Sequence, residues 1–219
     1  SNDCKAAEKK LVKAASKVYK KFLASCPAPD APGSKQVTAL MTITGLIDAP
    51  KADKEFLSIN GAQGFSTFYG YYMLEAMAMA GNYQGALDVI REYWGAMIDL
   101  GATSFWEDFD INWIPNAAPI DELVPEGKKD IHGDCGAYCY VGFRHSLCHG
   151  WASGPTSWLS RHILGVEVIE PGCRQVRITP HLGDLQWVKG TFPTPYGELQ
   201  IYHEKQANGN VISEVKAQP

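Results

Sequence analysis

Residues 66–80 have the sequence STFYGYYMLEAMAMA and are followed at once by Gly81. If this segment is helical, apolar and aromatic side chains cover nearly its whole circumference, and such a helix must be buried on most sides. Glycine just after the last turn commonly ends a helix, because it adopts a left-handed conformation without strain. We therefore predict a largely buried helix over residues 66–80.

Helical patterns also flank this segment. Apolar residues recur at helical spacing over residues 4–24, with lysines on the opposite face, and Ser34 is placed to cap a helix that runs to about residue 48. Two further helices are predicted over residues 83–99 and 151–164, each ending close to a glycine. Where the loops are short, consecutive helices should pack as antiparallel pairs.

The pattern changes after Gly165 from helical to β. Turn signals containing Pro, Gly or Asn-Gly separate five short segments rich in β-forming residues, and Asn208-Gly209 is a hairpin signal. The predicted strands cover residues 166–169, 174–178, 185–188, 198–202 and 210–215. The sequence thus predicts a mainly α protein with a C-terminal antiparallel β region, divided into residues 1–165 and 166–219.

The composition excludes several classes of protein. The 219 residues contain 24 acidic and 20 basic side chains, with no basic stripe, so no nucleic-acid partner is expected. No apolar run reaches the roughly 18 residues that a membrane-spanning helix needs, and the first residues lack the apolar core of a signal peptide. Six cysteines at irregular spacings in a chain of this length favour free thiols.

The first candidate site is the acidic and aromatic stretch Phe105-Trp106-Glu107-Asp108-Phe109-Asp110, which opens a long loop after residue 101. Long loops within a compact domain often carry function. A carboxylate among aromatic side chains in a cleft is suited to general acid or base catalysis, because its surroundings perturb its pKa. The alternative is a solvated acidic turn whose aromatic residues belong to the core.

The second candidate closes the same loop, where His149 and Trp151 precede the last predicted helix. His149 could donate to a sugar hydroxyl and Trp151 could stack on a sugar face; the alternative is a capping histidine and a core tryptophan. Cys135 and Cys139, followed by Cys148-His149, resemble zinc ligands only loosely. We expect no metal, and no cofactor-binding motif is present.

Three segments together resemble bacterial α-L-rhamnosidases. Residues 101–110, GATSFWEDFD, are similar to the family's G-A-T-T-x-W-E segment. Residues 145–151, HSLCHGW, with Gly154-Pro155 after them, resemble a second segment of the family, and residues 178–197 resemble its C-terminal β-domain. Each motif is weak alone, but the combination is specific and covers most of the chain.

The resemblance implies the second half of an (α/α)6 barrel over residues 1–165 and a small antiparallel β-sandwich over residues 166–219. The implied reaction is removal of terminal α-L-rhamnose from an oligosaccharide or glycoside, with inversion. Glu107 would be the general base, and the substrate-binding residues would be Trp106, Asp108, His149 and Trp151. The implied parent enzyme is bacterial and periplasmic or secreted, with a cytoplasmic location as the alternative.

The family's general acid lies in the first half of its barrel, and no residue of this sequence obviously replaces it. We therefore expect the chain alone to be inactive, and to self-associate or to borrow helices through its exposed half-barrel, because large apolar patches recruit partners. Two other interpretations remain open: a non-catalytic carbohydrate-binding or structural module, and another sugar enzyme built on an (α/α) barrel.

Overall fold

The computed structural model describes residues 34–130 and 146–218, with residues 10, 13, 14 and 17. The helix predicted over residues 4–24 falls largely outside them, as do Cys135 and Cys139. The helices are α2 (Lys35–Ile43), α3 (Ala49–Ala52), α4 (Gly70–Met79), α5 (Tyr83–Asp99) and α6 (Gly154–Trp158), with single π-helical turns at Asp53–Leu57 and Leu159–Ile163 and 3₁₀ turns at Ile111–Trp113, Gly150–Ala152 and Pro171–Cys173.

The starts and ends of the helices follow local signals. Ser34 caps α2 as predicted, its hydroxyl accepting from the amide of Val37. The helix ends at Ile43, earlier than predicted, and Gly45 follows with a positive φ of 76°. Helix α5 has the predicted bounds, and the side chain of Asn82 caps it by accepting from the amide of Gly85.

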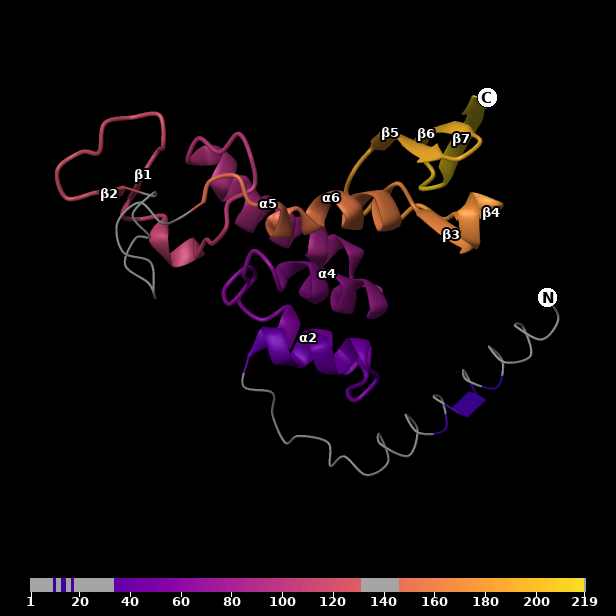
Figure 1. The fold of residues 1–219 in the computed structure, drawn as a ribbon, viewed down its shortest axis with the longest axis horizontal. Coiled ribbons are helices and arrows are strands. Elements are labelled where there is room, and N and C mark those ends of the chain that lie inside the picture. The colour runs from indigo at the N-terminus through magenta and orange to yellow at the C-terminus, as the bar shows by residue number, and fades with distance from the viewer. Residues whose placement is uncertain (1–9, 11–12, 15–16, 18–33, 131–145, 219) are drawn as a thin grey trace.

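Helices α2, α4 and α6 run parallel, with their first turns at the same end of the molecule. Gln36, in the first turn of α2, donates to the hydroxyl of Ser66, which lies just before α4. The rings of Phe68 and Trp151, which precede α4 and α6, lie 5.7 Å apart. Figure 1 shows the three helices stacked in one column. Helix α5 returns antiparallel to α4 after a three-residue connection.

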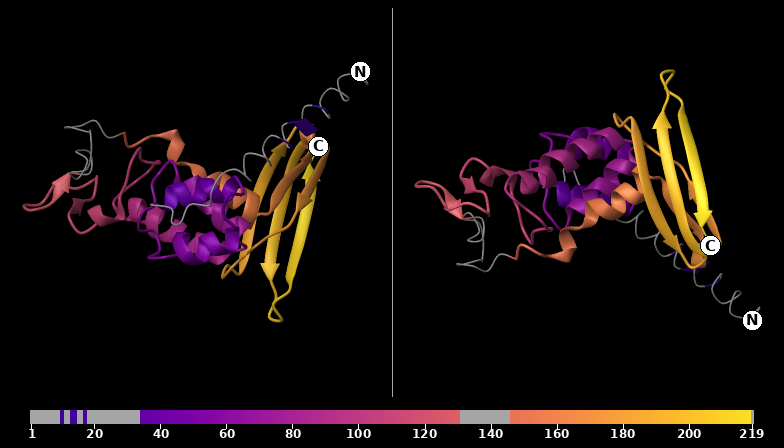
Figure 2. Two further views of the ribbon diagram at one scale, coloured as in Figure 1. Left: turned by 90° about the horizontal axis from the view of Figure 1, so that it is seen from below. Right: turned by 90° about the horizontal axis from the view of Figure 1, so that it is seen from above.

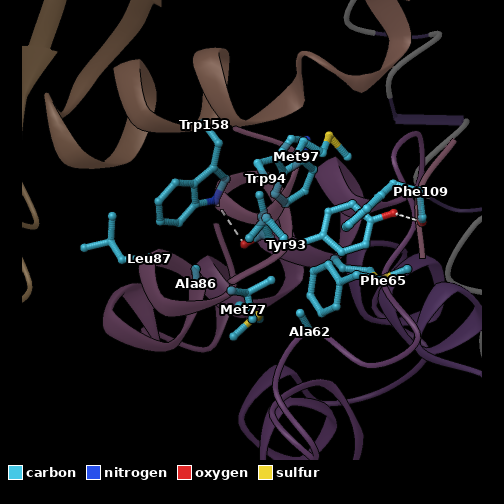
Figure 3. Packing of buried hydrophobic residues seen from close by; sticks show 14 of the residues in the cluster. Ala62, Phe65, Met77, Ala86, Leu87, Tyr93, Trp94, Met97, Phe109 and Trp158 are labelled. Carbon is cyan, nitrogen blue, oxygen red and sulfur yellow. Dashed lines mark hydrogen bonds between the residues drawn. The ribbon is translucent and has the colours of Figure 1, made fainter. Parts of the chain in front are cut away.

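The core lies between α4, α5, α6 and the start of the long loop (Figure 3). Met73, Leu74 and Met77 of α4 are fully buried, as predicted, whereas Phe68 before the helix and Met79 at its end are 41% and 53% exposed. The helix is therefore buried from its first residue through its middle and exposed at its last residue, Met79.

The segment predicted as one helix over residues 151–164 is broken into three pieces. A 3₁₀ turn precedes Ser153, and α6 begins only at Gly154, with Pro155 in its first turn, where the missing amide is not needed. A π-helical turn then continues to Ile163. Gly165 follows with a φ of 78°, and its Cα packs against the backbone of Thr179, which leaves no room for a side chain.

The β region contains the five predicted strands, all antiparallel. Strand β3 (Val166–Glu170) pairs with β4 (Gln175–Ile178), and β5 (Trp187–Thr194), β6 (Gly197–Lys205) and β7 (Val211–Gln218) form a second sheet in that order. The last three strands are longer than predicted. A mainly helical chain with a C-terminal antiparallel β region is therefore confirmed. The long loop adds an unpredicted parallel pair, β1 (Ala117–Ala118) and β2 (Lys129–Asp130).

The two sheets share a small apolar core of Leu164, Val166 and Ile201. Figure 2 shows their strands side by side at one end of the helical region. His203 of β6 is fully buried there and contacts the hydroxyl of Ser213 at 2.7 Å and the carbonyl oxygen of Leu164 at 3.1 Å. Within the described residues, no helix combines the length and apolar character needed to cross a membrane.

Candidate active site

The two candidate segments of the long loop are paired through their backbones. The amide of Glu107 donates to the carbonyl oxygen of Ser146 at 2.8 Å, and the amide of His149 donates to that of Phe105 at 2.7 Å. The side chain of Glu107 takes part as well, since its Oε2 accepts from the amide of Ser146 at 2.9 Å. Ser146, which is 39 residues away in the sequence, thereby bonds to both the backbone and the side chain of Glu107.

The segments before α4 and before α6 also converge on Glu107. Its carbonyl oxygen accepts from the hydroxyl of Thr67 at 2.5 Å and from the indole Nε1 of Trp151 at 2.6 Å. Thr67 is itself only 2% exposed, so its hydroxyl has little freedom to move. The half-buried Glu107 side chain therefore lies at the end of the molecule where the three parallel helices begin.

Aromatic neighbours anchor the acidic stretch in the core. Trp106 and Phe109 are 0% and 1% exposed, with their rings edge-to-face at 5.9 Å. The hydroxyl of Tyr93 donates to the carbonyl oxygen of Phe109. Burial first, and then the nearby Asp108 and Asp110 carboxylates, raise the pKa of Tyr93 well above its usual value, which keeps this donor protonated. Trp106 is therefore part of the core and not of the surface.

The other two carboxylates of the stretch hold the local backbone. Oδ1 of Asp108, which is half-buried, accepts from the amide of Phe109 at 2.9 Å. Oδ1 of Asp110 caps the 3₁₀ turn by accepting from the amide of Asn112 at 2.9 Å. The alternative interpretation, an acidic turn with core aromatics, agrees with the buried Trp106 and Phe109 and with the cap at Asp110. The hydrogen bonds of Glu107 reach other segments as well.

Exposed aromatic rings lie beside Glu107. Trp151 and Phe68 are 45% and 41% exposed, and the ring of the half-buried His149 lies 4.3 Å from that of Trp151. An open groove of about 410 Å³ runs from them along α4 and α6. It combines aromatic rings with a row of hydroxyls; its lining residues are Phe68, Tyr71, Tyr72, Trp151, Ser153, Gly154, Thr156, Ser157 and Ser160.

Of the predicted residues, the structure brings Glu107, His149 and Trp151 together. The side chain of Asp108 contacts the amide of Phe109, and Trp106 is buried in the core. Sequence reasoning missed Thr67, Phe68 and Ser146. Thr67 and Phe68 were assigned only to a helix, and no local pattern marks them as partners of the loop. Their role follows only from the three-dimensional structure, in which the segments before α4 and α6 lie side by side.

The described part of the chain offers no cluster of three His, Cys, Asp or Glu side chains that could hold a metal ion. Cys148 is an exposed free thiol and Cys173 a partly buried one, in line with the predicted thiol state of these two residues. The remaining four cysteines, and with them the loose zinc-like pattern around Cys135 and Cys139, lie outside the described residues.

Comparison with known proteins points to one family. Residues 165–217 match the family described as the bacterial alpha-L-rhamnosidase C-terminal domain. The fold is similar to that of a GH78 family rhamnosidase from Bacillus sp. GL1, with a TM-score of 0.63, 26% sequence identity, and coverage of 84% of this chain and 18% of that one. No curated protein sequence matches.

A second solved structure, the native α-L-rhamnosidase from Aspergillus terreus, has a TM-score of 0.65 and 21% identity, with coverage of 90% of this chain and 22% of that one. At this identity the likeness concerns the fold alone. Both likenesses extend well beyond the β region into the helices. The resemblance to α-L-rhamnosidases that the motifs indicate is therefore confirmed, and the chain spans about a fifth of the length of these proteins.

Proposed function

We propose that the chain is the C-terminal part of an inverting α-L-rhamnosidase and supplies its general base, Glu107. The observation that carries the proposal is the convergence on this residue: the segments before α4 and α6 both donate to its carbonyl oxygen, and the amide of Ser146 donates to its carboxylate. A carboxylate held by long-range hydrogen bonds beside exposed aromatic rings has the placement that general base catalysis needs.

The helical region is proposed to be part of an (α/α)6 barrel, with α2, α4 and α6 as inner helices and α5 as an outer one. The parallel direction of the three helices supports this, because consecutive inner helices of such a barrel start at the same end. Helix α2 also leaves an apolar stripe in solvent: Val37, Leu40 and Ile43 are 46%, 39% and 37% exposed. Residues at this spacing share one helix face, where a further helix would pack.

Inversion requires two carboxyl groups about 6.5–9.5 Å apart with a water molecule between them. Glu107 would take a proton from that water as it attacks the anomeric carbon, and the acid would protonate the leaving oxygen. Asp108 and Asp110 adjoin Glu107 and hold the local backbone, so neither suits a position across a sugar ring. The general acid therefore belongs to another part of the enzyme, and the chain alone should not hydrolyse rhamnosides.

The exposed rings next to Glu107 are suited to holding the substrate. Trp151 presents an indole face on which the apolar face of a rhamnose ring can stack, while its Nε1 remains fixed to Glu107. His149, beside it, can hydrogen-bond a hydroxyl, and Asp108 can accept another. Trp106, buried in the core, would help to fix the backbone on which Glu107 lies.

The test is Glu107→Gln in the intact enzyme, with release of L-rhamnose from an aryl α-L-rhamnoside as the readout. Loss of a general base should lower kcat by roughly 10²–10⁴-fold. Glu122→Gln, an exposed carboxylate on the same loop, is the matched control and should leave kcat unchanged. NMR of the first product should show the β-anomer. Unchanged turnover in Glu107→Gln, or release of the α-anomer, would contradict the proposal.

One other function has a specific observation in its favour. The exposed rings of Trp151 and Phe68, beside a groove lined with hydroxyls, would also suit a non-catalytic carbohydrate-binding module. In that case Glu107→Gln would leave the turnover of the intact enzyme unchanged. Hydrolysis of other glycosides without release of rhamnose would instead indicate another enzyme of the (α/α) barrel type.

The exposed stripe on α2 also bears on partners. We propose that the isolated chain self-associates through this face, because Val37, Leu40 and Ile43 would otherwise remain in water. Light scattering should give a mass above 24.0 kDa that falls toward the monomer in Leu40→Lys. A wild-type chain that is monomeric at high concentration would contradict this.

A further inference from the structure

The outer face of the three-stranded sheet carries an unusual set of side chains. Cross-strand rows place Trp187, Lys189 and Thr191 of β5 beside Glu204, Tyr202 and Gln200 of β6, and these beside Ile212, Glu214 and Lys216 of β7. Alternate residues of each strand point to this face. Trp187 and Ile212 are 60% and 53% exposed, so two large apolar side chains lie among polar ones in solvent.

This face is hollowed at its centre. A shallow depression of about 260 Å³ is lined by Lys189, Gln200, Ile201, Tyr202, Glu214 and Lys216. The ring of Trp187 lies 6.5 Å from that of Tyr202, with an angle of 28° between their planes. Pockets that enclose a compact ligand usually measure about 300–1,000 Å³. A ligand here would therefore lie across the sheet, with only part of it inside the depression.

The chemistry of the face matches hydroxyl groups. Lys189 and Lys216 are donors, Glu204 and Glu214 are acceptors, and Gln200 and Tyr202 can act as both. The register also places Glu198 on this face, so two positive and three negative side chains leave it close to neutral, and Lys216 and Glu214 lie 3.9 Å apart. A face this close to neutral attracts neither an anionic polymer nor a cationic one strongly. Paired donors and acceptors beside aromatic rings favour a neutral ligand with many hydroxyls and some apolar faces.

We propose that this outer face of β5, β6 and β7 is a non-catalytic binding surface for a neutral oligosaccharide. The indole of Trp187 and the ring of Tyr202 stack on the apolar faces of sugar rings, and the side chains around the depression bind their hydroxyls. A protein partner of similar area would bury these charged groups, which is costly unless each meets an opposite charge. A flexible sugar chain leaves them partly in water.

The surface lies on the opposite face of this sheet from the apolar core around Ile201, and no residue of the candidate active site belongs to it. Binding here therefore needs no catalytic carboxylate and does not require that Glu107 act as a base. Its role would be to retain a polymeric or branched sugar on the protein.

The experiment is calorimetric titration of the whole chain with a neutral rhamnan tetrasaccharide. Trp187→Ala should weaken the affinity at least tenfold, and Lys189→Ala should weaken it by a smaller factor. Tyr196→Ala is the matched control, because this tyrosine is 64% exposed in the turn between β5 and β6 and does not line the depression. It should change the affinity less than twofold.

Two further measurements separate this surface from the candidate active site. Trp151→Ala should leave the tetrasaccharide affinity at the sheet unchanged, and Trp187→Ala should leave hydrolysis of a small aryl rhamnoside by the intact enzyme unchanged. Wild-type chain that binds no tetrasaccharide at millimolar concentration would overturn the proposal. So would equal losses in Trp187→Ala and Tyr196→Ala, or tighter binding of an anionic oligogalacturonide of the same length.

Discussion

The helical region and the β region are held together by different kinds of hydrogen bond. In the helical region, buried or half-buried side chains bond to backbone oxygens far away in sequence: Trp94 to Ala152, Trp158 to Leu74 and Thr67 to Glu107. In the β region, the bonds are mostly backbone ladders between strands joined by short turns. The position of Glu107 thus depends on hydrogen bonds from individual side chains, whereas the sheet is held by the backbone hydrogen bonds between its paired strands.

The largest expected effect concerns one of those side chains. Trp158 is fully buried and its Nε1 donates to Leu74 at 3.0 Å, so Trp158→Ala should lower the free energy of unfolding by about 3–5 kcal/mol. Urea denaturation measures this. Trp187→Ala, the same change on the exposed sheet face, should cost less than about 0.5 kcal/mol. Similar losses in the free energy of unfolding for Trp158→Ala and Trp187→Ala would contradict the view that the helical core provides most of the stability.

His203 is a fully buried side chain of the β region whose hydrogen bonds, like those of the helical region, reach distant residues. It bonds to Ser213 and to the backbone of Leu164, where helices and strands meet. His203→Ala would leave these partners unsatisfied and should lower the free energy of unfolding by about 1–3 kcal/mol. The exposed neighbour Glu204 is the control, and its replacement by Ala should have little effect. A His203→Ala protein with the free energy of unfolding of wild type would contradict a structural role for the hydrogen bonds of His203.

The smallest expected effect is electrostatic. Oε1 of Glu75 in α4 lies 3.0 Å from Nε2 of His162, and Oε2 lies 3.5 Å from Arg161. Burial raises the pKa of Glu75, but its hydrogen bond to His162 and the charges of His162 and Arg161 outweigh this, so the pKa lies below the ordinary 4.5. The ionised form therefore stabilises the fold above that value, and the benefit is lost as the pH falls through the lowered pKa.

Glu75→Gln should accordingly lower the Tm near neutral pH, and its difference from wild type should shrink as the pH falls below 4.5. Glu167→Gln is the control, because Glu167 pairs with Arg177 in solvent and should show little difference at any pH. If the difference in Tm between Glu75→Gln and wild type stays constant from pH 7 to pH 3, the side chain stabilises the fold by packing and not by its charge.

The same contrast explains what the sequence could predict. The bounds of α5 and the hairpin at Asn208-Gly209 follow from signals within a few residues, and both were predicted correctly. Strand β5 was predicted over residues 185–188 but covers Trp187–Thr194. Pro193 is a poor strand residue that is tolerated here because β5 is an edge strand of its sheet. Local sequence signals are therefore sufficient to predict most of the β region.

The surroundings of Glu107 were beyond sequence reasoning for the opposite reason. Its identity as a candidate came from a local motif, but its partners Thr67 and Ser146 lie 40 and 39 residues away and carry no mark of their role. The break before α6 was also missed, since the helical pattern continues through Ser153. Only packing between the segments before α4 and α6 determines these features.

The most direct test of Glu107 as a general base is chemical rescue of Glu107→Ala in the intact enzyme. Removing the carboxylate leaves space for a small anion, and azide can attack the anomeric carbon without losing a proton. We predict that Glu107→Ala is nearly inactive in water and that azide restores turnover with formation of β-L-rhamnosyl azide. A Glu107→Ala enzyme that keeps wild-type activity without azide would contradict the assignment, as would one that azide fails to rescue.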